Sequence, residues 1–134
     1  MELREGVLEF LDEIRLRNIK CGLITDLTAN IQFRKLIRLG LEDKFDVITT
    51  SEEIGFDKPH PDCFIKTIKK MYHSYNKKEH KIWMIGDDLD KDIYGAIDNL
   101  NAKGFLYSKK KVKINVAKEK VIIFDNYYSL IEQL

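Results

Sequence analysis

Four carboxylates occur within six residues, directly after a short apolar run (residues 82–85) and a glycine: Asp87, Asp88, Asp90 and Asp92. The apolar run indicates a buried strand, and parallel strands deliver the residues that follow them to the ligand-binding edge of an open α/β sheet. Crowded carboxylates repel one another unless a cation lies among them, and oxygen-only clusters suit a hard ion such as Mg²⁺. Helix capping accounts for Asp90, but not for Asp87, which lies at the strand tip before any helix. The stretch therefore predicts a magnesium site.

Two other predicted strand ends carry residues that suit the same chemistry. Thr25 and Asp26 end the first apolar run, and Lys58 lies in the loop after the second. A hydroxyl, a fixed cation and a metal-binding carboxylate around one crevice make a phosphate site. Each residue alone is a weak signal. For Lys58, the alternative is a simple ion pair with its neighbour Asp57. Their order and spacing together are more specific.

The elements that must position these residues alternate along the chain. Apolar periodicity predicts helices over residues 6–17, from 28 or 30 to 39, 61–72, 90–101 and 126–134, with one helical turn at 52–54. It predicts strands over residues 20–25, 45–50, 82–86, 103–107 and 121–124. This alternation with short connections is typical of a parallel sheet with helices on both faces. We expect residues 1–134 to form one domain.

Composition narrows the classes of partner. A net charge of +1 over 134 residues argues against nucleic acid or a membrane surface as the main partner. No apolar run approaches the roughly 20 residues of a membrane span. The two cysteines lack metal-ligand spacing, which favours a reducing, cytoplasmic location. The lysine-rich run at residues 109–113 is interpreted as a solvated loop. His60 is a lone loop histidine and receives no role.

Three segments resemble motifs of the haloacid dehalogenase-like (HAD) hydrolase superfamily. Residues 19–26, 50–61 and 85–96 are similar to the second, third and fourth motifs of that family, in the same order. The resemblance implies a Rossmann-like, three-layer α/β fold. It implies that Thr25, with Asp26, binds phosphate and that Lys58 steadies the phosphate and the nucleophile. Lys58 and Asp87 would be catalytic, and Asp87 would hold Mg²⁺ with Asp92 or Asp88 assisting.

The family's first motif, Asp-x-Asp-x-Thr, has no counterpart before Thr25. Residues 1–18 instead resemble the helix that follows the family's cap domain. The resemblance thus implies that the nucleophile, the cap and the first, central strand are missing. Loss of that strand would leave an unpaired gap, force its neighbours together, or expose edges to a second copy or a complementing chain. Asp26-Leu27-Thr28 is a less favoured first motif, because no second-motif strand then remains before Lys58.

The resemblance favours a Mg²⁺-dependent phosphomonoester phosphatase that acts on a small phosphorylated metabolite through an aspartyl phosphate. The chain would be a fragment or a truncated member lacking the nucleophile Asp. The alternative is a catalytically inactive module that binds Mg²⁺ and phosphate or another protein. A generic nucleotide-binding domain is least favoured, because no glycine-rich phosphate loop is present.

Overall fold

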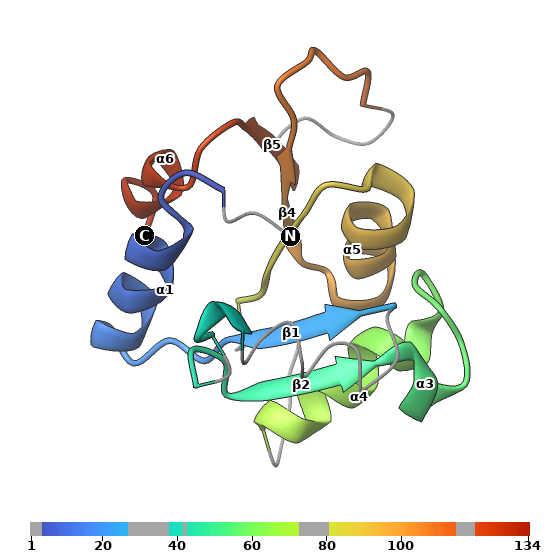
Figure 1. The fold of residues 1–134 in the computed structure, drawn as a ribbon. Helices are drawn as coiled ribbons and strands as arrows, with labels where there is room; N and C mark the ends of the chain where they lie inside the picture. The colour runs from blue at the N-terminus through green and yellow to red at the C-terminus, as the bar shows by residue number, and fades with distance from the viewer. Residues whose placement is uncertain (1–3, 27–37, 42, 73–80, 115–119) are drawn as a thin grey trace.

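Five strands form two separate parallel sheets (Figure 1). The computed structural model describes residues 4–26, 38–41, 43–72, 81–114 and 120–134. One sheet pairs β1 (Gly22–Thr25) with β2 (Val47–Thr50). The other has the order β3 (Trp83–Gly86), β4 (Lys103–Tyr107), β5 (Val121–Phe124). All pairings are parallel, as the sequence predicts.

The described helices follow the predicted order: α1 (Val7–Leu16), α3 (Ser51–Ile54), α4 (Pro61–Met71), α5 (Gly95–Leu100) and α6 (Tyr128–Ile131). The helix predicted to end at residue 39 falls mostly on residues 27–37, outside the described part of the chain. Among the described residues, no helix combines the length and apolar character needed to cross a bilayer.

Two predicted helices differ from the structure. The helix predicted from residue 90 begins instead as a π-helical turn, η1 (Leu89–Tyr94), before α5 continues it. The helix predicted over residues 126–134 is α-helical only in α6, because the amides of Gln133 and Leu134 bond carbonyls three residues back rather than four. Such bonds tighten a helix end into a 3₁₀ turn.

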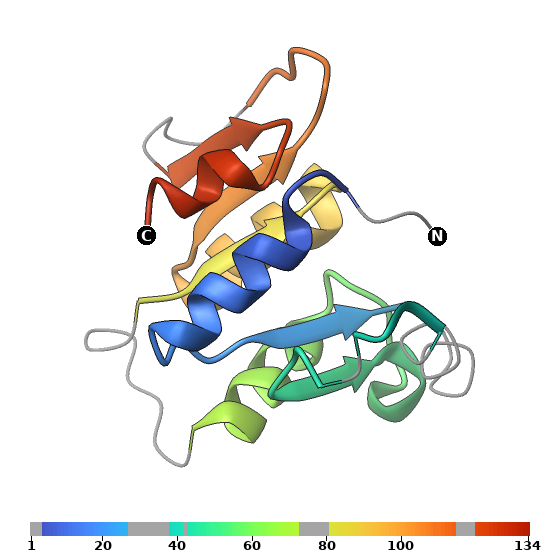
Figure 2. The same ribbon diagram turned by 60° about the vertical axis from the view of Figure 1, so that its left-hand side comes forward.

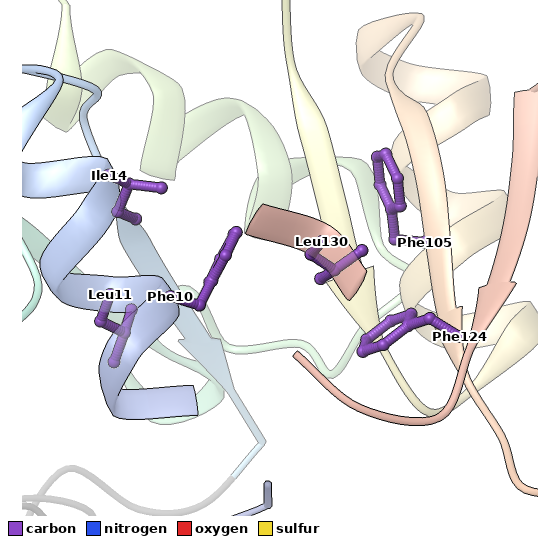
Figure 3. Close-up of a cluster of buried hydrophobic side chains, with 6 residues drawn as sticks. All are labelled: Phe10, Leu11, Ile14, Phe105, Phe124 and Leu130. Carbon is purple, nitrogen blue, oxygen red and sulfur yellow. The ribbon is translucent and has the colours of Figure 1, made fainter. Parts of the chain in front are cut away.

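Helix α1 packs one apolar face against the three-stranded sheet and against residues that precede β1 and β2. Its buried residues Phe10, Leu11 and Ile14 share a cluster with Phe105, Phe124 and Leu130 (Figure 3). Partly buried side chains pack against this cluster, including Trp83 and Ile85 of β3, and Cys21, which directly precedes β1. Figure 2 shows α1 lying along the junction between the two sheets.

Helices α4 and α5 close the opposite face. Their buried residues form a second cluster, which is packed against Ile24 of β1 and Met84 of β3. Gly95 allows the two helices to approach closely, since a Cβ there would lie 2.7 Å from Phe64 Cζ. The sheets are therefore joined through helices on both faces, while β1 and β3 belong to different sheets and share no ladder. Of the three arrangements expected for a missing central strand, the described structure has the one in which its two neighbours, β1 and β3, are not paired with each other.

Candidate functional site

Lys58 and Asp92 form the most buried ion pair in the described part of the chain. Lys58 Nζ lies 2.7 Å from Asp92 Oδ1, and the side chains are only 12% and 8% exposed. Lys58 Nζ also donates to the carbonyl oxygen of Ile24, at 3.3 Å. Because Ile24 is in β1 and Asp92 follows β3, the ammonium links the carboxyl ends of strands from the two sheets. The expected juxtaposition of these strand ends is present.

The loop that carries Lys58 is fixed on both sides. Thr50 caps α3 through a reciprocal capping box with Glu53, and Gly55 ends that helix in the left-handed region at φ 87°. The backbone N–H of Lys58 then donates to Asp26 Oδ1 at 3.1 Å. The following Lys58–Pro59 peptide bond is cis. Asp26 thus anchors the loop that carries Lys58, and the side chain of Lys58 reaches Asp92.

The turn after β3 is shaped around the Asp92 carboxylate. A Cβ on Gly86 would lie 2.3 Å from Asp92 Oδ2, so only glycine leaves room for this side chain. The backbone N–H of Asp88 donates to the same oxygen at 3.3 Å. Asp88 itself caps η1, because its Oδ1 accepts from the Lys91 N–H at 2.8 Å. π-helical turns, which are wider than α-helical ones, are frequent at functional sites.

Asp87 pairs with Arg4 rather than with Lys58. The Arg4 guanidinium donates to Asp87 Oδ2 at 2.8 Å, and its carbon lies 3.9 Å from the centre of the Tyr107 ring. Burial opposes the charge of Arg4, but the Asp87 carboxylate outweighs it and raises the pKa of the guanidinium. The Asp87 side chain remains 58% exposed. Of the two ion-paired carboxylates after β3, Asp87 is therefore far more accessible than Asp92.

The remaining sequence-predicted residues lie close by. Thr25 ends β1, paired in register with Thr50 of β2. Lys58 pairs with Asp92 rather than with its neighbour Asp57, which corrects the expected alternative. His60 has a structural place, since its Nδ1 accepts the Asp62 N–H at the start of α4 and its ring stacks on Phe56 with centres 4.0 Å apart.

A thiol also lies near this edge. Cys63 in α4 is buried, and its Sγ donates to the carbonyl oxygen of Phe56. Burial, with the nearby Asp26 carboxylate, raises the pKa of the Cys63 thiol. A protonated, buried thiol is a poor nucleophile. Cys63 is therefore a poor candidate for a nucleophile, and a carboxylate is the better one.

The three carboxylates predicted as metal ligands can be tested for fit. Their oxygen donors suit Mg²⁺. Within the described residues, however, no three acidic, histidine or cysteine side chains converge on a common point. Asp92 faces Lys58, Asp88 caps η1, and Asp87 faces Arg4. Asp87 and Asp88 are exposed and Asp92 is buried, so a metal at this edge would need further ligands from elsewhere, and the ligand set of Asp87, Asp88 and Asp92 stays a prediction.

Sequence reasoning missed two residues of this edge. Arg4 lies 83 positions from Asp87 and no local pattern marks it. Ser51 donates its Oγ to the carbonyl oxygen of Asp26, at 2.9 Å. Ser51 lies directly after a predicted strand, which is a weak signal for a residue at the same sheet edge.

Curated proteins that resemble this chain are phosphatases. The chain is 36% identical over 96 residues to ribulose-1,5-bisphosphate 5-phosphatase from Halopiger xanaduensis, covering 72% of this chain and 38% of that protein. It is 39% identical to glyceraldehyde 3-phosphate phosphatase from Methanopyrus kandleri, covering 67% of this chain and 37% of that one. The chain thus spans little more than a third of the length of these relatives.

Solved structures share the fold over nearly the whole chain. A HAD phosphatase from Thermococcus onnurineus superposes with a TM-score of 0.83 at 26% identity, covering 98% of this chain and 58% of that one. The HAD-hydrolase YfnB from Bacillus subtilis, solved bound to magnesium, gives a TM-score of 0.78 at 21% identity, with 96% and 54% covered. The family model for haloacid dehalogenase-like hydrolases matches residues 1–103. The chain belongs to the haloacid dehalogenase-like hydrolase family.

Proposed function

We propose that this chain forms the C-terminal part of a Mg²⁺-dependent phosphomonoester phosphatase. The observation that carries the proposal is the buried Lys58 ammonium, held between Asp92 and the Ile24 carbonyl where strands of the two sheets end. A fixed cation at that point suits the charge that develops on a transferring phosphoryl group. The phosphatase relatives support the same reaction class.

The nucleophilic carboxylate would come from a strand that lies between β1 and β3. Within the described residues, β1 pairs only with β2 and β3 only with β4. Helix α1 covers one face of the junction, and α4 with α5 covers the other. An entering strand would thus be apolar on both faces and parallel to its neighbours, and it would end in a carboxylate beside Lys58. A longer form of this polypeptide or a complementing chain could supply it.

Each residue then has a distinct task. Thr25 and nearby backbone N–H groups hold phosphate oxygens, while Asp26 fixes the Lys58 loop. Lys58 balances the charge of the phosphate and of the entering carboxylate. Asp87 holds Mg²⁺, with Asp88 or Asp92 assisting, and the bound ion would supply Lewis-acid neutralisation of phosphate charge. The reaction is attack of the carboxylate on phosphorus, departure of the alcohol, and hydrolysis of the acyl phosphate.

Small phosphorylated metabolites are the proposed substrate class, and sugar phosphates are the first to test because the named relatives act on such molecules. We further propose that residues 1–134 act as one domain and that the protein works in the cytoplasm. No nucleic acid or membrane partner is proposed.

The test compares this chain with the longest form present in its source cells. An immunoblot gives the natural mass, and we expect a band heavier than the 15.8 kDa of this sequence. With p-nitrophenyl phosphate and Mg²⁺, this chain should show no turnover and the natural form should show turnover. Lys58→Met and Asp87→Asn in the natural form should each abolish it. Turnover that survives both substitutions would overturn the proposal.

A second candidate function is an inactive module that binds Mg²⁺ and phosphate or pairs with another chain. The observation that favours it is that one edge of β1 and one edge of β3 have no strand partner among the residues that the structure describes. A natural mass of 15.8 kDa with no turnover would select this candidate.

A further inference from the structure

Asp26 bonds to both ends of the segment that leads from β2 to Lys58. Its backbone carbonyl oxygen accepts a hydrogen bond from Ser51 Oγ at 2.9 Å, and its Oδ1 accepts one from the Lys58 N–H at 3.1 Å. Ser51 directly follows β2 and begins α3, whereas Lys58 lies in the loop after α3. A residue directly after β1 thus fixes the start and the end of a connection that leaves the neighbouring strand.

The connection is also held along its length, so its two ends are coupled. After α3, the His60 N–H donates to the carbonyl oxygen of Asp57 at 3.1 Å, which closes the turn that contains Lys58. The thiol of Cys63 donates to the carbonyl oxygen of Phe56 at 3.3 Å. Because both the helix and the turn are hydrogen-bonded, a displacement at the start of α3 is carried to Lys58.

The Lys58 ammonium can face an anion only from one position. Its Nζ lies 2.7 Å from Asp92 Oδ1 and 3.3 Å from the carbonyl oxygen of Ile24. An ammonium has three hydrogens to donate, so one remains for an entering phosphate once both described contacts are made. A shift of the Lys58 backbone would weaken these contacts and turn the remaining hydrogen away from the strand ends.

Ser51 and Asp26 are poorly suited to hold the phosphate themselves. The Ser51 hydroxyl has a single hydrogen, which it gives to the Asp26 carbonyl oxygen. The Asp26 carboxylate has no hydrogen to donate, and it would repel a phosphate dianion. Both residues can therefore serve the site through the position of Lys58 rather than by touching the ligand.

We propose that Ser51 is a positioning residue for Lys58 and that it acts through Asp26. The inference rests on the proposed function in one respect, that Lys58 faces the phosphate. The Ser51 hydroxyl fixes the backbone of Asp26, and the Asp26 carboxylate fixes the backbone of Lys58. Loss of the hydroxyl loosens Lys58 without removing any charge from the site.

The test follows the side-chain ammonium signal of Lys58 in low-temperature ¹⁵N spectra of the 134-residue chain, assigned by its loss in Lys58→Arg. Ser51→Ala should shift this signal and weaken orthophosphate binding about fivefold, the factor that matches the typical net contribution of one hydrogen bond. Ser51→Thr, which keeps a hydroxyl, should restore both. The matched control is Ser129→Ala, which removes a partly buried hydroxyl that donates to the Asn126 carbonyl oxygen at 2.7 Å. It should change neither readout.

A second variant tests the route through Asp26. Asp26→Ala removes the acceptor of the Lys58 N–H, so it should shift the ammonium signal in the same direction as Ser51→Ala. A double variant should then shift the signal little more than Asp26→Ala alone, because both substitutions break one chain of contacts. A shift in Ser51→Ala that is absent from Asp26→Ala would overturn the route.

The outcomes separate this inference from the proposed function. An unchanged Lys58 ammonium signal in Ser51→Ala overturns the positioning role, and a lower urea midpoint beside that unchanged signal assigns Ser51 a purely structural role. Failure of orthophosphate to bind the parent chain counts against the proposed phosphate site. The ammonium signal still decides the positioning role in that case, because it is measured without phosphate.

Discussion

Replacing Lys58 by methionine should destabilise the fold far more than loss of an ordinary ion pair. The substitution leaves the Asp92 carboxylate 8% exposed without its cation. Asp92 Oδ1 has no hydrogen-bond partner in the described residues apart from this ion-pair contact, whereas Oδ2 keeps the Asp88 N–H. Breaking a buried pair from one side typically costs about 3–5 kcal/mol, and the remaining bond to Oδ2 favours the lower end. We expect a loss of about 3 kcal/mol.

Urea unfolding provides the assay, because the fluorescence of Trp83, the single tryptophan, reports on β3. The double variant Lys58→Met with Asp92→Leu should be less destabilised than the sum of the single variants, by about 2 kcal/mol. Lys44→Met is the matched control, since it breaks a 2.6 Å pair with the exposed Asp12 and should cost no more than about 1 kcal/mol. The reasoning would be refuted if Lys58→Met lowered the free energy of unfolding by less than about 1 kcal/mol and if the effects of Lys58→Met and Asp92→Leu were additive in the double variant.

Three further predictions rest on single contacts. Gly86→Ala should lower the urea midpoint by an amount worth about 1–3 kcal/mol, because its Cβ would collide with Asp92 Oδ2; an unchanged midpoint would contradict the packing. Burial opposes the charge of Glu53, but hydrogen bonds from Lys70 and the Thr50 amide outweigh it and lower the Glu53 pKa below its ordinary 4.5. A depressed carboxyl pKa stabilises the fold above pH 4.5 and loses that effect as the pH falls, so Lys70→Gln should raise the Glu53 pKa in an NMR titration. Burial, with Asp46, raises the pKa of Cys21 to about 12. Iodoacetamide should therefore modify Cys21 far more slowly at pH 8 in the native chain than in urea, and equal rates would argue against burial.

Local patterns were sufficient for most elements of the fold. The apolar runs that predict strands 103–107 and 121–124 match β4 and β5, because short buried strands bounded by polar residues leave little choice of register. The start of α4 was also predictable, since Pro61 suits the first helical position. The π-helical turn was not, because it depends on Asp92 turning back to Lys58 across the fold.

The candidate site was predictable only in part. Asp26, Lys58 and Asp92 lie together, as expected for residues at the carboxyl ends of parallel strands. The sequence alone did not predict which carboxylate would form the ion pair with Lys58. Asp57 is adjacent in the chain, while Asp92 is reached only through the packing of two sheets. Arg4 could not have been found from spacing, because its partner Asp87 lies 83 positions further along the chain.

The most direct test of the proposed site is a titration of the ¹⁵N-labelled chain with orthophosphate in the presence of Mg²⁺. The account predicts amide shifts centred on Thr25, Lys58 and Asp87, and their loss in Lys58→Met. Shifts confined to the lysine-rich run at residues 109–113, or no shifts at all, would contradict a phosphate site at this edge of the sheets.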